Sequence, residues 1–191
     1  MNYKMMGKFI SQILFVEAVF MLPALLISVL ECNIPGIWGF ALSIVITAAV
    51  ASVLYALCRH AVRRFYAREG LVCVGMSWIF MSLLGCLPFF MSGEIPNFLD
   101  ALFEIVSGFT TTGASILSNV EGLSKGMLYW RSFSHWLGGM GVLVFLLAVG
   151  ERGDKGSGFT LHLLRAESPG PTVGKLVPKM RTTARILYLM Y

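Results

Sequence analysis

Long apolar runs alternate with short polar segments along this chain. A membrane-spanning helix needs about 20 mostly apolar residues. Four runs are long enough, at residues 9–30, 37–58, 71–92 and 128–149. A further apolar run covers residues 186–191. The pattern predicts an all-α integral membrane protein whose chain crosses the bilayer four times before residue 150.

The composition supports a membrane location. The chain is 57% hydrophobic and 13% charged, with a mean hydropathy of +0.76, whereas soluble domains are nearer half apolar and a quarter charged. The four cysteines, Cys32, Cys58, Cys73 and Cys86, lack metal-site spacing. We therefore expect free thiols that pack as small apolar side chains.

The basic residues predict the orientation of the chain. With the N-terminus in the cytoplasm, the inner segments hold 13 of the 15 Lys and Arg residues, and only Lys125 and Arg131 lie outside. Positive charge concentrates on the cytoplasmic side of membrane proteins. The net charge of +5 is therefore interpreted as a topological signal rather than as a nucleic-acid site. The segment 94–127 must then begin and end outside.

That outer segment contains a helix too short to cross the membrane. Asn97 is a good N-cap and Asp100 complements the dipole of the first turn, which predicts a helix from Phe98 to Phe109. Twelve residues span about 18 Å, against the ~30 Å of the hydrocarbon core. The helix can enter halfway, and the return segment Thr110–Ser115 would line an aqueous path. The alternative is a helix that lies flat on the outer surface.

The return segment carries the oxygens that a dehydrated cation needs. Carbonyl rings replace the hydration shell of K⁺ in its filters, and a glycine lets the backbone turn its carbonyls to one axis. The predicted carbonyl ligands are Thr111, Thr112, Gly113 and Ala114, flanked by Thr110 and Ser115. We place K⁺ at Thr111 and Thr112, with the Thr111 hydroxyl at the inner edge. The C-terminal dipole of the preceding helix would add negative charge near the ion.

Charged residues near this segment have two interpretations. Glu94, Asp100, Glu104 and Glu121 could attract cations to an outer mouth. Glu104 could instead be a structural acceptor for nearby backbone or for Arg131, and the pair would then support the filter. Arg131 could also simply extend to the membrane interface.

Three further polar or small-residue features lie within the apolar runs. Glu17 is expected to face another helix and pair there. His135 has no metal-ligand partner pattern, which favours a packed, hydrogen-bonded histidine. The small residues Ser134, Gly138 and Gly141 favour close helix packing, with a hinge in the helix as the alternative.

Several motifs together resemble one known family. They are TTTGAS at 110–115, YWRSF at 129–133, WLGGMG at 136–141 and LRAESPGP at 164–171. Their order is similar to the first membrane–pore–membrane repeat of Trk-type potassium uptake membrane subunits, in the Trk/Ktr/HKT superfamily. The resemblance divides the chain into a two-helix hairpin at 1–70, a repeat at 71–150, a cytoplasmic connector at 151–183 and the start of the next repeat at 184–191.

The resemblance implies a function and partners. Members carry four repeats around one pore, assemble as homodimers in the bacterial inner membrane and are controlled by a cytosolic nucleotide-binding subunit. K⁺ is the transported ion, and no organic cofactor is expected. Glycine at the position of Gly113 goes with K⁺ selectivity in the superfamily, whereas serine in some plant members goes with Na⁺. We expect this chain, with one full repeat, to be the N-terminal part of a longer protein.

Two other functions compete with a transport pore. A membrane-embedded enzyme would need matched catalytic groups, and the candidates, His135 and Glu17, lie on different predicted helices. A non-conducting membrane fragment or assembly protein remains the alternative. An open reading frame that continues past Tyr191 would discriminate against a natural fragment.

Overall fold

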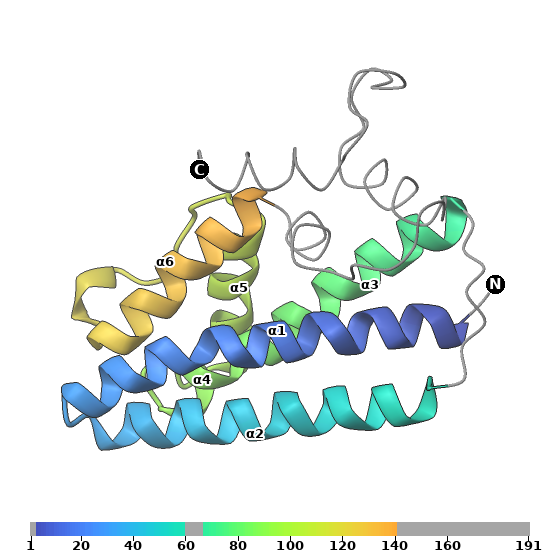
Figure 1. Cartoon of the computed structure of the whole chain (residues 1–191). Helices are drawn as coiled ribbons and strands as arrows, with labels where there is room; N and C mark the ends of the chain where they lie inside the picture. Colours follow the sequence, from blue (N-terminus) through green and yellow to red (C-terminus); the bar gives the residue numbers. More distant parts are fainter. Residues whose placement is uncertain (1–2, 60–66, 141–191) are drawn as a thin grey trace, which may run out of the picture.

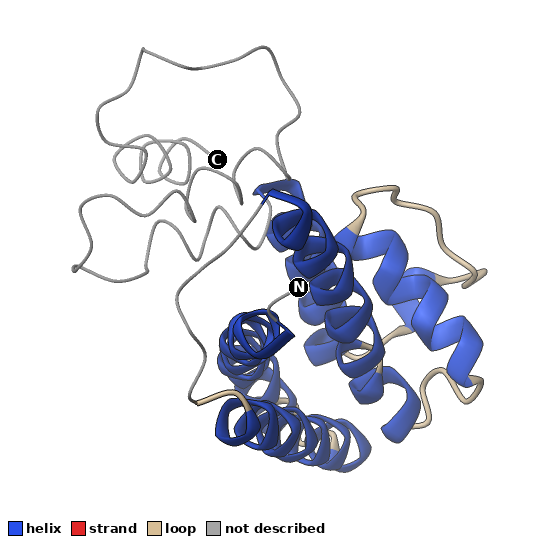
Figure 2. Cartoon of the chain, turned by 90° about the vertical axis from the view of Figure 1, so that its right-hand side faces the viewer, coloured by secondary structure: helices blue, strands red, loops and turns tan. Residues whose placement is uncertain are grey.

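The chain folds into helices joined by loops, as Figures 1 and 2 show. The computed structural model describes residues 3–59 and 67–140. In these residues the elements are α1 (Tyr3–Leu30), α2 (Ile34–Leu57), α3 (Ala67–Gly85), α4 (Leu87–Met91), α5 (Phe98–Phe109), the 3₁₀ turn η1 (Val120–Gly122) and α6 (Lys125–Met140). The predicted all-α class is confirmed.

Three helical segments are long and apolar enough to cross a membrane. They are Tyr3–Leu30, Ile34–Leu57 and Val72–Met91, which confirms the first three predicted runs. The fourth run begins within α6, but its residues after 140 lie outside the described part of the chain. The predicted connector and the run at 186–191 lie outside it as well.

The hairpin of α1 and α2 forms one side of the structure, with the two helices side by side along their lengths (Figure 1). Asn33 ends the tight turn, and its side chain accepts a hydrogen bond from the Gly36 amide at 3.3 Å. Small residues allow the close approach, because Gly7 faces Cys58 and Gly36 faces Ser28. The hairpin supplies the wall on which the other helices pack.

The third predicted span is divided into two helices. Pro88 removes one backbone donor, α3 ends at Gly85, and α4 begins at Leu87. The Gly85 carbonyl at this break accepts a hydrogen bond from Trp130 Nε1 of α6 at 2.9 Å. The third predicted run is thus a helical segment with a break between Gly85 and Leu87, and the break gives α6 an attachment point.

Two carboxylates hold the first turn of α6 against the hairpin. Glu94 accepts from the Ser124 amide at 3.0 Å and from Asn33 Nδ2 at 3.3 Å. Glu31 accepts from the Lys125 amide at 3.0 Å. Helix N-termini have unpaired amides and a positive dipole end, so both contacts fix where α6 begins.

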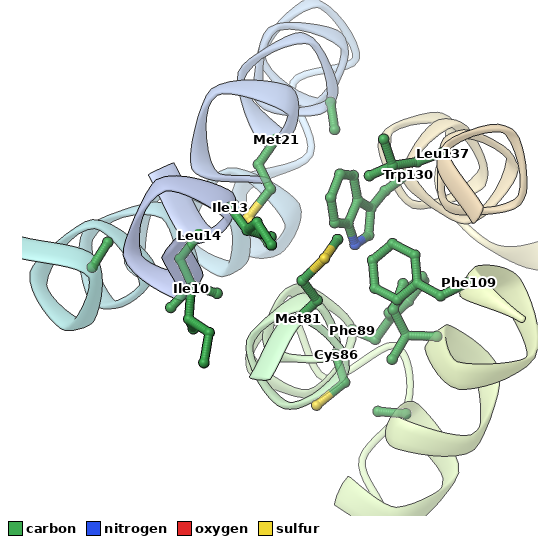
Figure 3. Packing of buried hydrophobic residues seen from close by; sticks show 14 of the residues in the cluster. Ile10, Ile13, Leu14, Met21, Met81, Cys86, Phe89, Phe109, Trp130 and Leu137 are labelled. Atoms are coloured by element: carbon green, nitrogen blue, oxygen red, sulfur yellow. The ribbon is translucent and has the colours of Figure 1, made fainter. Parts of the chain in front are cut away.

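The core lies between α1, α3, α5 and α6. Figure 3 shows side chains from these helices converging there, among them Met21, Met81, Phe109, Trp130 and Leu137. Gly138 allows α5 to lie directly on α6, because a Cβ at this position would overlap the Phe109 carbonyl. This contact agrees with the predicted close packing, although Gly141 lies outside the described residues.

Glu17 departs from its prediction. Its side chain on α1 is fully buried, and within residues 3–59 and 67–140 neither carboxylate oxygen has a hydrogen-bond partner. One oxygen faces Gly85 at the end of α3. Among the described residues, the predicted pairing is wrong, because α3 presents Gly85 at this level, and glycine has no side chain with which to pair.

The contact of α5 with α6 gives a stability prediction. Gly138→Ala should destabilise the complete gene product by about 1–3 kcal/mol, because the new methyl group meets backbone that cannot rotate away. Thermal unfolding in detergent measures this loss. Gly75 is the matched control, since it lies on α3 and a Cβ added there would have no heavy atom within 4 Å, and Gly75→Ala should be neutral or stabilising. Equal unfolding midpoints for both variants would contradict the packing.

Candidate cation-binding site

The short helix before the candidate site forms as predicted. α5 covers Phe98–Phe109, and the Asn97 side chain accepts from the Leu99 amide at 3.1 Å. Its buried face includes Ala101, Glu104 and Ile105. In Figure 1, α5 lies beside α6, and its C-terminal end leads directly into the threonine segment.

The end of α5 is a Schellman motif. The Thr112 amide donates to the Ser107 carbonyl at 3.0 Å, and the Thr111 amide donates to the Gly108 carbonyl at 2.9 Å. Thr111 has φ +55°, the left-handed conformation usually taken by glycine at this position. A side chain there costs roughly 1–2 kcal/mol. The chain therefore keeps a strained threonine at the first predicted ligand position.

Gly113 also has a positive φ, of +74°. A Cβ at this position would have no heavy atom within 4 Å. Backbone conformation, and not lack of space, therefore favours glycine here. This observation agrees with the reason for which the sequence singled out the residue.

The threonine hydroxyls use their hydrogens within the loop. Thr110 Oγ1 donates to the Val106 carbonyl at 2.8 Å, and Thr111 Oγ1 donates to the Thr110 carbonyl at 2.7 Å. Thr112 Oγ1 lies 2.8 Å from Thr110 Oγ1. Because the single hydrogen of Thr110 is already used, this bond assigns Thr112 as its donor. The exposed Thr111 and Thr112 oxygens are left with lone pairs only.

The carbonyls of Thr111, Thr112 and Gly113 are three consecutive free acceptors in the loop that follows α5. In the described part of the chain, no hydrogen bond reaches the carbonyls of Thr111, Thr112 or Gly113. The Ala114 carbonyl, by contrast, accepts from Ser107 Oγ at 2.5 Å. Residues 111–113 thus present three free carbonyls, while the Ala114 carbonyl retains one lone pair. The Gly113 amide also has no acceptor within the described residues.

Glu104 connects the far end of the loop to α6. Its buried carboxylate accepts from Ser115 Oγ at 3.0 Å, from the Ile116 amide at 3.2 Å and from Arg131 Nε at 2.5 Å. The Arg131 side chain is 17% exposed and that of Glu104 is 0% exposed. These contacts correspond to the structural-acceptor interpretation of Glu104 and do not place its charge at an open mouth.

The other polar residues near the loop have their own partners or positions. Glu94 is bonded to Asn33 and the Ser124 amide, and Glu121 is exposed on η1. His135 Nδ1 lies 2.9 Å from the Arg131 carbonyl, as expected for a packed histidine. Across residues 3–59 and 67–140, no group of three or more His, Cys, Asp or Glu side chains could hold a metal ion.

Two contacts at this site were missed from the sequence. The Ile116 amide carries no side-chain signal, because any residue except proline supplies it. No contact was predicted for the Ser107 side chain. Its place one turn before the helix end was a signal, since a short hydroxyl there can reach the chain that follows.

The chain is similar to potassium transport proteins. A family model described as a cation transport protein (TrkH) matches residues 38–191. The Trk system potassium uptake protein TrkH of Halomonas elongata is 32% identical over 194 residues, covering 100% of this chain and 39% of the relative. TrkH of Salmonella typhimurium is 35% identical over 156 residues, covering 80% of this chain and 32% of the relative.

The chain is also similar to a solved structure. The crystal structure of the potassium transporter TrkH from Vibrio parahaemolyticus matches with a TM-score of 0.76 and 26% identity, covering 100% of this chain and 37% of that one. The present chain therefore spans less than two-fifths of the length of these relatives.

The two buried glutamates should respond differently to the same substitution. Glu104→Gln leaves the Arg131 guanidinium without its carboxylate and should cost about 2–3 kcal/mol of stability, as expected for a lost hydrogen bond between charged groups. Glu17→Gln removes an acid that has no partner in the described part of the chain, so the unfolding midpoint should stay the same or rise. Thermal unfolding of the complete gene product tests both. If both variants lost the same stability, the hydrogen bonds of Glu104 would contribute no stability of their own.

Proposed function

The chain belongs to the TrkH family of cation transport proteins, and from this membership we propose that its α5 and following loop supply one quarter of a potassium selectivity filter. The family consists of transporters and not of enzymes. The named relatives are potassium uptake proteins, so K⁺ is the proposed cargo. Because this chain spans only part of their length, the activity is proposed for the complete gene product.

The observation that carries the proposal is the set of oxygens at residues 111–113. A K⁺ ion leaving water needs oxygens that replace its hydration shell. The three free carbonyls offer lone pairs, and so do the Thr111 and Thr112 hydroxyl oxygens, whose hydrogens are used within the loop. We assign K⁺ binding to Thr111, Thr112 and Gly113, with the remaining lone pair of Ala114 at the edge of the site.

The surrounding contacts supply charge and position. The C-terminal end of α5 leads into the loop, and its partial negative charge would favour a cation there. Thr110 and Ser115 flank the ligands, and Ser115 is bonded to Glu104. Glu104 and Arg131 act in this account as positioning residues. They do not touch the ion.

The remaining parts of the proposal concern the assembly. One loop forms one side of a ring, and the other three sides would come from further repeats or further chains. We propose a homodimer in the bacterial inner membrane, with the N-terminus in the cytoplasm and a cytosolic nucleotide-binding regulatory subunit. The proposed units are residues 1–70, 71–150, 151–183 and 184–191. Membership of a transporter family argues against a non-conducting assembly protein.

Substitution of Gly113 tests the filter assignment. Gly113→Ser should lower the preference for K⁺ over Na⁺, because a side chain at φ +74° changes the backbone that carries the free carbonyls. Ion flux into proteoliposomes containing the complete gene product measures the preference. Gly93 is the control, since it has φ +77° and equally open surroundings but lies before α5. An unchanged ratio for Gly113→Ser would count strongly against the filter.

Substitution of Thr111 distinguishes the effect of its backbone conformation from the effect of its hydroxyl. Thr111→Gly suits the left-handed position and should not reduce stability, but it removes one proposed ligand oxygen. The concentration of K⁺ needed for half-maximal uptake should therefore rise. Cys32→Gly relieves the same angle, φ +55°, in the α1–α2 turn, and it should leave K⁺ uptake unchanged. If the K⁺ concentration for half-maximal uptake stayed the same in Thr111→Gly as in Cys32→Gly, the Thr111 hydroxyl would have no part in ion binding.

A further inference from the structure

Ser107 makes a contact that the proposed function does not use. Its side chain is buried on α5, and its hydroxyl donates to the Ala114 carbonyl at 2.5 Å. Its own carbonyl accepts from the Thr112 amide at 3.0 Å. One residue of the helix therefore holds the loop at two points, on either side of Gly113.

This contact differs from those of other helix serines in the chain. The hydroxyls of Ser28, Ser43, Ser52 and Ser77 each donate to the carbonyl four residues earlier in the same helix. Such back-bonding is the usual choice of a serine within a helix. Ser107 instead donates forward by seven residues to a loop carbonyl. The difference indicates a bond that organises the loop.

The two attachment points enclose the peptides with free carbonyls. The Thr112 amide fixes the peptide plane before Thr112, and the Ala114 carbonyl fixes the plane after Ala114. The Thr112 and Gly113 carbonyls lie on the two planes between these points. Their direction therefore depends on both ends of this short segment being held.

We propose that Ser107 is a positioning residue that determines ion specificity, and this inference rests on the proposed filter. Its hydroxyl holds the Ala114 carbonyl toward α5 and so fixes the spacing of the Thr112 and Gly113 carbonyls. A loop released at this end can close around a smaller ion, and Na⁺ is the smaller competitor of K⁺. Ser107 is buried, and its hydrogen is used, so it acts through the loop and not on the ion.

The test compares three serine variants of the complete gene product in proteoliposomes. Ser107→Ala should lower the K⁺/Na⁺ flux ratio about 3- to 10-fold, the change that corresponds to one net hydrogen bond. Ser107→Thr keeps the hydroxyl and should retain most of the ratio. Ser77→Ala removes a buried hydroxyl with an ordinary helix bond and should behave like the wild type. An unchanged ratio in Ser107→Ala would overturn the inference.

A replacement variant and a comparison with Gly113→Ser distinguish the role of Ser107 from the proposed filter. If Ser107→Ala does not fold, Ser107→Cys takes its place, because cysteine keeps the shape of serine but is only a weak hydrogen-bond donor. The K⁺/Na⁺ flux ratio of this variant then tests the inference in the same way. If Gly113→Ser lowers the ratio and the Ser107 variant does not, the filter stands and the role of Ser107 is wrong. If neither variant lowers it, the proposed function fails as well.

Discussion

The buried carboxylate of Glu104 is the interaction on which the geometry of the loop depends. It receives the Ser115 hydroxyl, the Ile116 amide and the Arg131 guanidinium, so one side chain joins α5, the end of the loop and α6. Charge-assisted hydrogen bonds are stronger than neutral ones, and burial strengthens them further. The carboxylate in turn needs all these donors, because an unpaired buried charge is costly.

The rest of the site follows from a loop that is held at both ends. At its start, the Schellman motif at Ser107 and Gly108 ends the helix, and at its finish Glu104 holds Ser115 and Ile116. Between them, the hydroxyl hydrogens are used internally, and the carbonyls of residues 111–113 remain free. These free acceptors lie on exposed residues between the two held ends.

Much of this arrangement could be predicted from local sequence. The bounds of α5 followed from the Asn97 cap and the apolar run, and the first three spans followed from length and hydropathy. The conformation of Gly113 followed from its residue type. These features depend on neighbouring residues in the chain, and the structure agrees with them.

Features that depend on tertiary contacts could not be predicted in this way. The sequence left the role of Glu104 open because the choice depends on where Arg131 and Ser115 lie. The third span was predicted from its apolar run, but the break at Cys86 became evident only with Trp130 bonded to the Gly85 carbonyl. Glu17 was expected to find a partner, and the helix beside it offers glycine. Thr111 occupies a position where residue statistics favour glycine.

Locating the bound ion tests directly whether Thr111, Thr112 and Gly113 bind K⁺. Crystals of the complete gene product, grown with thallium(I) in place of K⁺, would show this ion by its anomalous scattering. If residues 111–113 bind K⁺, anomalous density will lie within coordination distance of the carbonyl oxygens of Thr111, Thr112 and Gly113. Density elsewhere along the conduction path, with none beside these residues, would contradict it.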